Sequence, residues 1–387
     1  MKNPRIWVVS ATISVTALTL TACGTKTKTT ASPSNISIAS PSSTSIGSVP
    51  SGTSSSGAAA GSTEASSTSP VSAAPSGKPF KVGVSWDNKS IALIQAWEDY
   101  QQQIAKEQGL NFQWVYTVAD DDPAKQASNI EDMINQGVNV IVARASDSAA
   151  IGSSIKAAAA AKIPFVAFDR APTKEKPTAY VGGDSRDEAL TTATKLAELM
   201  KAAGVKGKCI ELLGALTDVN AVNRTKAFAE VAASSGAYTI VQQVPTEWKP
   251  DLFLSGTTNA LKAHPEANCL LTASDFAFPS IQSALEGAGK WAKIGDPKHI
   301  WIGALDVFPE AYAAMKAGYI DVGTTWDAFS HSKELVKALA AISKGQDPGC
   351  PETGCLAKGR LATPSTVDSL ENVWSRDYNP DGSKKKK

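Results

Sequence analysis

Short apolar runs and helix-length segments alternate along the chain from residue 78 onward. The runs at residues 80–85 (FKVGVS) and 138–143 (VNVIVA) have the length and β-branched content of buried strands. Strands that alternate with helices indicate βαβ units, and continuous apolar runs indicate sheets covered on both faces. Strands are predicted at 80–85, 111–118, 138–143, 164–168, 179–182, 208–213, 238–244, 267–273, 299–305 and about 321–325, and helices at 91–108, 123–136, 149–161, 187–203, 220–233, 251–262 and 279–287.

This rhythm occurs twice, which predicts two lobes of the same kind. The first series ends near residue 182, and the second begins with the helix at 187–203. The expected fold class is α/β, with two doubly wound parallel-sheet lobes joined by a hinge. Ligands of such lobes bind at the carboxyl ends of the strands. The residues that directly follow each strand are therefore the candidates for a site.

Residues 1–22 have the order of a bacterial export signal. Lys2 and Arg5 precede an apolar run over residues 6–20, which is too short for a membrane span of about 20 residues. The sequence LTAC, ending at Cys23, resembles the lipobox of bacterial lipoproteins, whose cysteine becomes lipidated and N-terminal. The resemblance implies acyl chains such as palmitate on Cys23 and an extracytoplasmic protein anchored to the cell membrane. The alternative is an ordinary secretory signal with a chance cysteine.

Residues 23–78 are expected to form a disordered linker. Residues 31–76 contain 18 Ser and 4 Thr, with Ala, Gly and Pro filling most other positions. Such a composition cannot bury enough apolar surface to offset the entropy lost on ordering. A random coil of this length spans roughly 40 Å, which would hold a folded domain away from a membrane.

The charge balance argues against a nucleic-acid binder. Lys and Arg total 38 and Asp and Glu total 37, for a formal net charge of +1, whereas a nucleic-acid binder needs a basic face. No pair among His264, His299 and His331 has metal-ligand spacing, and the sequence has no Walker-type phosphate loop. No metal and no cofactor are expected.

Four cysteines remain after Cys23, and an even number outside the cytosol suggests disulfides. Cys350 and Cys355 enclose a short loop that could close locally. Cys209 and Cys269 each lie near the start of an apolar strand, and those two strands could be neighbours. The alternative for the second pair is two buried free thiols.

The residues that follow the predicted strands share one chemical character. They are mainly carboxylates, carboxamides, an Asp-Arg pair and tryptophans: Trp86, Asp87, Asn88, Lys89, Asp169, Arg170, Asp218, Asn220, Trp248, Ser274, Asp275, Asp306, Trp326 and Asp327. Asp, Asn and Arg bond vicinal hydroxyls in pairs, and an indole face packs against the C–H face of a sugar. The set predicts a sugar site between the lobes. For Asp87, Ser274 and Asp306 taken singly, a helix cap or turn is the alternative.

These residues resemble the type I periplasmic sugar-binding proteins, which are substrate-binding components of ABC importers, over about residues 79–375. The segment 163–170 (IPFVAFDR) is similar to the family strand whose final Asp-Arg pair grips sugar hydroxyls. Segments 217–221 (TDVNA) and 247–250 (EWKP) resemble the ligand loop and stacking tryptophan of the xylose-binding branch, with Val219 replacing an asparagine. Ser274 replaces a family amide, and Asp306 matches the strand-end aspartate.

The resemblance also implies an architecture and a function. Three hinge crossings would divide the chain into a first lobe at 79–183 plus 327–355 and a second lobe at 184–326 plus 356–378. A flexible Lys-rich tail would follow at 379–387. The implied protein is a monomer and not an enzyme. It would close over a xylose- or ribose-like monosaccharide and deliver it to an ABC permease in the membrane.

Two departures from the family pattern leave the identity of the sugar open. The segment 86–89 (WDNK) lacks the basic residue expected further into its helix, and Asp327 lies near the position where the xylose-binding branch has a lysine.

A receptor for a non-sugar polar ligand, or a sensor serving a chemoreceptor or membrane kinase, is an alternative function. Repressors with this two-lobe fold carry an N-terminal helix-turn-helix, where this chain has a signal and a linker. No Ser–His or Cys–His pair occurs at the strand ends, which argues against an enzyme. Asp169 and Asp306 could act as the acid and the nucleophile of a glycosidase, an alternative that product formation would reveal.

Overall fold

The computed structural model describes residues 77–386. The expected signal peptide at 1–22, the lipidation site Cys23 and almost all of the linker at 23–78 lie outside these described residues. Across residues 77–386, none of the helices has the length and apolar content needed to cross a membrane.

The elements follow the predicted alternation of strands and helices. The first series is β1 (Phe80–Trp86), α1 (Ala92–Glu107), β2 (Phe112–Val118), α2 (Pro123–Asn135), β3 (Val140–Ala143), α3 (Gly152–Ala160), β4 (Phe165–Phe168) and β5 (Ala179–Gly183). The second is α4 (Ser185–Ala202), β6 (Gly207–Leu213), α5 (Val219–Ser235), β7 (Tyr238–Pro245), α6 (Pro250–Ala263), β8 (Cys269–Thr272), α7 (Phe278–Gly287), β9 (Trp301–Asp306), α8 (Pro309–Lys316) and β10 (Val322–Thr325). The last elements are α9 (Ala328–Ser343), β11 (Cys355–Ala357), β12 (Leu361–Ala362) and α10 (Trp374–Asp377).

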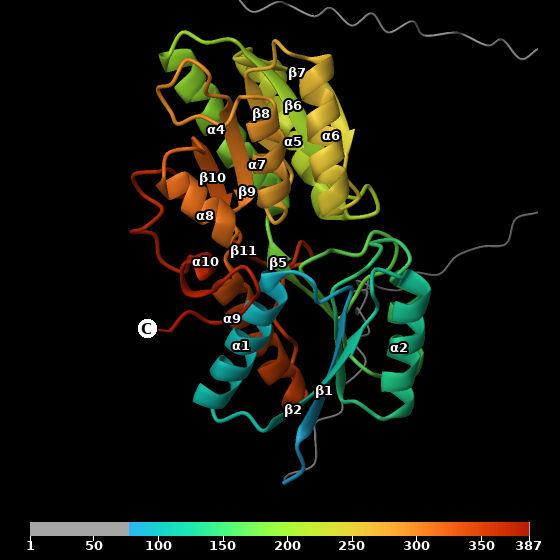
Figure 1. The fold of residues 1–387 in the computed structure, drawn as a ribbon. Coiled ribbons are helices and arrows are strands. Elements are labelled where there is room, and N and C mark those ends of the chain that lie inside the picture. Colours follow the sequence, from blue (N-terminus) through green and yellow to red (C-terminus); the bar gives the residue numbers. More distant parts are fainter. Residues whose placement is uncertain (1–76, 387) are drawn as a thin grey trace, which may run out of the picture. The chain divides into compact units, whose positions relative to one another are not determined.

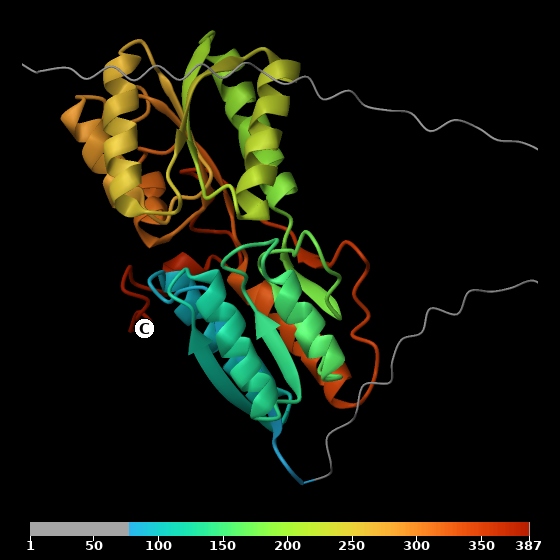
Figure 2. The same cartoon turned by 90° about the vertical axis from the view of Figure 1, so that its right-hand side faces the viewer.

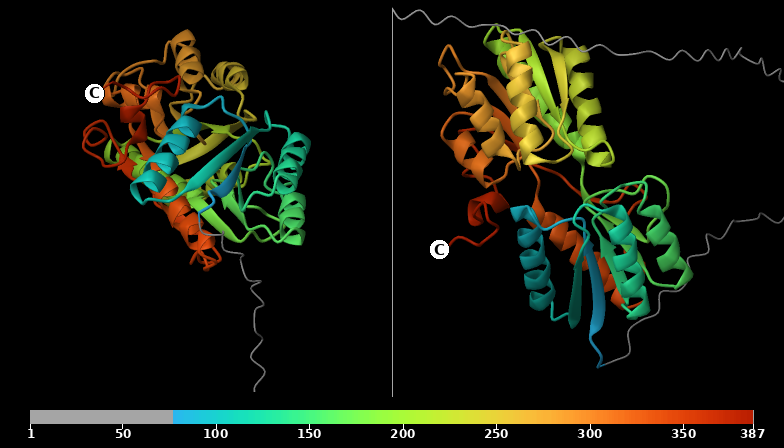
Figure 3. Two further views of the ribbon diagram at one scale, coloured as in Figure 1. Left: turned by 90° about the horizontal axis from the view of Figure 1, so that it is seen from below. Right: turned by 45° about the vertical axis from the view of Figure 1, so that its right-hand side comes forward.

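The first lobe is built on a parallel sheet with the strand order β11-β5-β4-β3-β1-β2. One face of the sheet packs against α1 and α9, around Trp97 and Leu339. The other face packs against α2 and α3, around Ile130 and Ile155. Figure 3 shows α1 and α2 on opposite sides of the sheet. Because both faces are covered, the central strands are apolar throughout.

The second lobe repeats this plan with the strand order β12-β10-β9-β8-β6-β7 (Figure 1). Helices α6, α7 and α8 contribute to the core on one face, and α4 and α5 to the core on the other (Figure 2). The expectation of two doubly wound lobes is confirmed. The short strand β12 differs from it, because β12 pairs antiparallel with β10 at the edge of an otherwise parallel sheet.

Each sheet changes winding direction beside its first strand, between β1 and β3 in the first lobe and between β6 and β8 in the second. Such a switch point leaves a crevice at the carboxyl ends of the strands. Asp87 and Arg144 follow the two strands of the first crevice, and Gly214 and Ser274 lie just after those of the second. The topology thus fixes where a ligand can bind.

The chain crosses between the sheets after β5, after β10, and between β11 and β12. The expected third boundary at 355–356 falls inside β11, whose residues Cys355–Ala357 pair with β5. This crossing therefore lies after Ala357.

Helices α8 and α9 were not predicted. Helix α4 begins two residues before the expected 187, because Asp184 accepts a hydrogen bond from the N–H of Asp187.

Two disulfides occur within residues 77–386. Cys209 and Cys269 are bonded, and they occupy paired positions on the adjacent strands β6 and β8. Cys350 is bonded to Cys355 in the loop that leads into β11. The first bond lies in the interior of the second lobe, because both of its cysteines are fully buried.

The segment at 379–386, which was expected to be flexible, lies against α1. Lys384 forms an isolated bridge with Tyr378, and its ammonium lies 5.9 Å and 5.8 Å from the ring centroids of Tyr100 and Tyr378. The Tyr378 hydroxyl donates to the Asp99 carboxylate over 3.0 Å. Cation–π contacts thus hold a segment that its composition marks as solvated.

Candidate functional site

A cavity that opens to solvent lies between the strand ends of the two sheets. Residues from both lobes line it. Nine of the fourteen residues predicted for a site are among them: Asn88, Asp169, Arg170, Asp218, Asn220, Trp248, Ser274, Asp306 and Trp326. The structure therefore brings together most of the strand-end residues on which the sugar-site prediction depends.

The first-lobe wall is a buried network of two guanidinium groups and two carboxylates. Arg144 Nε donates to Asp169 Oδ2 over 2.6 Å, and Arg144 Nη1 donates to Asp87. Arg170 Nη1 also donates to Asp87, over 2.8 Å. Burial by itself would raise the pKa of Asp169, but Arg144 and Arg170 outweigh it and hold that pKa below its usual value. Asp169 is therefore ionised at neutral pH.

The second-lobe wall is organised around Arg224. Its Nη2 donates to Asp306 Oδ1 over 2.6 Å and to Glu188 Oε2 over 2.7 Å, and its Nη1 donates to the carbonyl oxygen of Ala273 over 2.7 Å. The Ser274 hydroxyl donates to Asp306 as well. Burial raises the pKa of Glu188 well above its usual value, although Arg224 opposes the rise. Arg144, Arg170 and Arg224 therefore each form an ion pair with at least one buried carboxylate.

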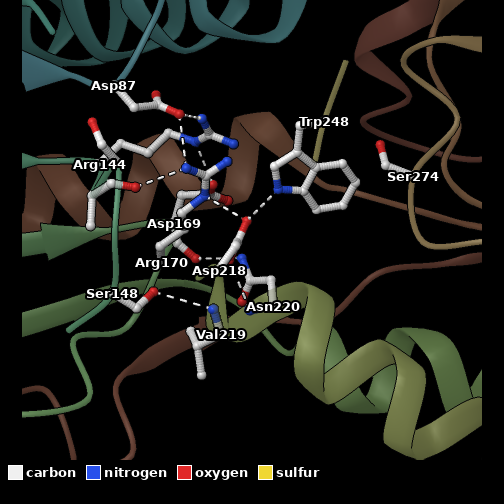
Figure 4. A network of polar contacts seen from close by, with 12 residues as sticks. Asp87, Arg144, Ser148, Asp169, Arg170, Asp218, Val219, Asn220, Trp248 and Ser274 are labelled. Atoms are coloured by element: carbon white, nitrogen blue, oxygen red, sulfur yellow. Dashed lines mark hydrogen bonds and ion pairs between the residues drawn. The ribbon is translucent and has the colours of Figure 1, made fainter. Parts of the chain in front are cut away.

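Polar contacts join the two walls directly (Figure 4). Arg170 Nε of the first lobe lies 2.7 Å from Asp218 Oδ2 of the second. Asn220 Nδ2 donates to the backbone oxygen of Asp169 over 3.0 Å. Asp218 also begins α5, since its Oδ1 accepts from the N–H of Asn220. Residues 218–220 are therefore fixed by a helix cap and also bonded across to the facing lobe.

Two tryptophans line the cavity, and a carboxylate orients each. Trp248 Nε1 donates to Asp218 Oδ2 over 3.1 Å, and Trp326 Nε1 donates to Asp169 Oδ1 over 2.8 Å. The Trp248 indole leaves no room beside Gly214, where a Cβ would approach it to well under 3.0 Å. These bonds hold two flat apolar surfaces beside polar groups, which is the combination that a sugar ring requires.

Three residues of the site have left-handed backbone conformations, which L-residues other than glycine seldom adopt. The φ angles are 66° at Asp169, 56° at Trp248 and 84° at Asp306. All three lie at the end of a strand or shortly after one. Strained backbone of this kind is concentrated at functional sites, where it directs a side chain that regular structure would point elsewhere.

Three predicted residues around β1 do not line the cavity. Trp86 is the last residue of β1, and its fully buried indole donates to Glu98 Oε1 over 2.7 Å. Lys89 is bonded to the same carboxylate over 2.8 Å. Asp87 lies behind the cavity wall, where it binds Arg144 and Arg170. It therefore positions other side chains of the site.

Asp275 and Asp327 also lie outside the cavity lining. Asp275 accepts from the backbone N–H groups of Val307 and Phe308 over 3.1 Å and 2.8 Å. Burial raises its pKa well above the usual value, and Asp306 adds to the rise. Asp327 caps α9 by accepting from the N–H of Ser330 over 2.9 Å. Both aspartates organise backbone, which is the alternative role for strand-end carboxylates.

The cavity is also lined by Arg144, Arg224, Phe276 and Phe308, which were not among the predicted site residues. Arg144 directly follows β3, so the strand-end criterion would have selected it. Arg224 is four residues after Asn220 on α5, and this spacing puts the two side chains on one helix face. The sequence around the two phenylalanines does not distinguish them from ordinary core residues.

Among residues 77–386, no group of three or more His, Cys, Asp or Glu side chains could hold a metal ion.

Parts of the chain resemble known proteins in sequence. A family model described as a periplasmic binding protein domain matches residues 82–347. A putative rhizopine-binding protein of Rhizobium meliloti is 31% identical over 232 residues, which are 58% of this chain and 72% of the relative. The ribose import binding protein of Salmonella typhimurium is 26% identical over 211 residues, 54% of this chain and 67% of the relative.

Solved structures share the fold. An ABC transporter solute-binding protein from Bacillus halodurans, with bound myo-inositol, superposes with a TM-score of 0.67 at 21% identity. The superposition covers 77% of this chain and 100% of that protein.

Proposed function

Because the chain belongs to the type I periplasmic sugar-binding protein family, we propose that it is the solute-binding component of an ABC importer. In this proposal it binds one monosaccharide or related cyclic or open-chain polyol in the cavity between its lobes and delivers it to a permease. The observation that carries the proposal is the cavity itself, in which Asp169, Arg170, Asn220, Trp248 and Asp306 meet.

The pairing of charges supports a neutral, hydroxyl-rich ligand. Arg144, Arg170 and Arg224 each contact at least one buried carboxylate. A phosphate or carboxylate ligand would have to compete with these carboxylates for the guanidinium groups. Hydroxyls instead accept and donate within such a network while leaving its ion pairs in place. The relative named above for ribose and the fold neighbour with myo-inositol fit this ligand class.

The acid–base properties of the site favour binding over hydrolysis. A glycosidase needs one carboxylic acid that keeps a proton to give to the leaving group. Asp169 does not suit that role, because Arg144 and Arg170 hold its pKa below the usual value. Asp306 is bonded to Arg224 and Ser274. Both carboxylates are arranged as hydrogen-bond acceptors.

The test of this function is a thermal-shift panel on the purified protein with pentoses, hexoses, inositols and polyols at about 1 mM. Amino acids and nucleosides serve as the contrasting classes. A ligand at a hundred times its dissociation constant stabilises by about 2.7 kcal/mol, which raises the melting temperature by about 5–10 °C. We expect one sugar or a few related polyols to give such a shift.

Trp248→Ala should abolish that shift, because it removes a stacking surface from the cavity. Trp291→Ala is the matched control, since Trp291 stacks on Tyr319 at a centroid distance of 4.2 Å and does not line the cavity. A shift with an amino acid or nucleoside and none with any sugar would overturn the proposed ligand class.

We also propose that Cys23 carries the lipid that attaches the protein to the extracytoplasmic face of the membrane. Several acyl chains give stable anchoring, at about 0.8 kcal/mol per buried CH₂ group. Cys23→Ala should therefore move the protein from the membrane fraction to the soluble exported fraction and abolish labelling by radioactive palmitate. Retention of the variant in the membrane fraction would contradict lipid anchoring at this residue.

A further inference from the structure

Two hydrogen bonds join the lobes at a place outside the cavity. The N–H of Ser148, in the loop after β3, donates to the backbone oxygen of Thr217 over 3.0 Å. In return, the Ser148 hydroxyl accepts from the N–H of Val219, the first residue of α5, over 3.2 Å. Figure 4 shows the second of these contacts beside Asp218 and Asn220. One residue of the first lobe thus bonds two backbone groups in the second lobe, at Thr217 and at the first residue of α5.

The first lobe holds Ser148 in place independently of the second lobe. Asp147 Oδ1 accepts from the N–H groups of Ala149 and Ala150, each over 2.7 Å, which fixes the turn. The N–H of Thr173 donates to the backbone oxygen of Ser148 over 2.8 Å. Ser148 is only 3% exposed. The backbone of Ser148, including the N–H that bonds Thr217, is therefore held by its own lobe, which reduces the entropy lost when that bond forms.

None of Ser148, Thr217 and Val219 lines the cavity, although Asp218 and Asn220 on either side of Val219 do. On the second lobe, both bonds use backbone atoms. A ligand in the cavity therefore need not contact this bridge. Its contribution to holding the lobes together does not depend on which hydroxyls the ligand presents.

We infer that Ser148 is a latch residue, which stabilises the arrangement with the lobes together and so sets how long a ligand stays bound. The inference rests on the proposed function, since it concerns release from the same cavity. A bond that exists only with the lobes together raises the population of that arrangement and tightens every ligand by the same factor. Ser148 is thus a positioning residue that affects affinity without affecting selectivity.

The test compares Ser148→Ala with Ser146→Ala. Ser146 lies in the same loop, and its buried hydroxyl has no hydrogen-bond partner. Loss of one such bond should accelerate ligand dissociation by about two- to tenfold, with the association rate nearly unchanged. The factor should be equal for every sugar or polyol that binds. Ser146→Ala should dissociate like the unmodified protein, and Ser148→Thr, which keeps the hydroxyl, should restore slow dissociation.

A second measurement needs no ligand. Hydrogen exchange at the amide of residue 148, whose bond to the Thr217 oxygen survives the substitution, should be faster in Ser148→Ala by a similar factor and unchanged in Ser146→Ala, because opening of the lobes exposes this N–H. Unchanged exchange at this amide in Ser148→Ala would overturn the latch even if no panel compound bound. A dissociation factor that differed between ligands would also overturn it, because Ser148 would then be a ligand contact.

Discussion

Asp169→Asn should raise the dissociation constant for the bound sugar by about 30-fold or more and lower the melting temperature as well. Asp169 accepts from Arg144 Nε over 2.6 Å and from Trp326 Nε1 over 2.8 Å. An amide of the same shape must turn its NH₂ group toward one of these donors, and it leaves Arg144 with one fewer negative partner. Truncating one member of a buried, hydrogen-bonded charge pair costs about 2–5 kcal/mol in binding, which is the basis of this fold-change.

The matched control is Asp321→Asn. Asp321 is also buried, and it accepts from the N–H of Ile302 over 2.7 Å and contacts His299. It does not line the cavity. Titration calorimetry should find its affinity for sugar unchanged, although the variant melts at a lower temperature. Equal losses of affinity in the two variants would mean that Asp169 acts only through general stability.

The same carboxylate gives a pH dependence of stability. The pKa of Asp169 is lower in the folded protein than its usual value of 3.8. Its contribution is therefore complete above that usual value and is lost as the pH falls through the lower, folded-state pKa. In Asp169→Asn this part of the acid sensitivity should be missing.

Gly214→Ala should weaken sugar binding by about fivefold or more, although Gly214 has no side chain to contact a ligand. A Cβ at this position would overlap the indole of Trp248. Overpacking of this kind costs about 1–3 kcal/mol, and the indole must move away from the cavity and from Asp218 to relieve it. The expected loss of affinity is that cost expressed as a ratio of dissociation constants.

Gly287→Ala is the control for this substitution. Gly287 is the last residue of α7, and a Cβ there would meet no atom within 4 Å. The change should leave sugar affinity unchanged and stabilise the helix slightly, because alanine loses less backbone entropy than glycine. Calorimetric titration of both variants with one sugar checks the pair. Wild-type affinity in Gly214→Ala would show that the Trp248 indole is not held where the cavity requires it.

The strand ends made much of this site predictable. Parallel strands bring their carboxyl ends to one edge, so Asp169, Arg170, Ser274 and Asp306 could be identified without knowing how the lobes meet. The same criterion could not separate Ser274, which lines the cavity, from its neighbour Asp275, which binds backbone. That distinction depends on local backbone angles, which composition and periodicity do not report.

Other features depend on contacts that no local pattern encodes. Trp86 seemed to follow β1, but the strand includes it, and its side chain points into the core beside Trp97. Asp87 was expected to contact a ligand, but it lies behind the wall and accepts hydrogen bonds from two arginines. The hydrogen bond between Ser148 and Val219 could not be predicted from the sequence, because it depends on how one lobe is placed against the other.

A sugar or polyol should bind in the cavity between the lobes through the network around Asp169. Calorimetric titration of the purified protein with the sugar or polyol that gives the largest thermal shift decides whether it does. We predict one binding site per chain, with affinity reduced about 30-fold or more in Asp169→Asn and unchanged in Asp321→Asn. Such binding would be contradicted by no saturable heat with any sugar or polyol, or by full affinity in Asp169→Asn.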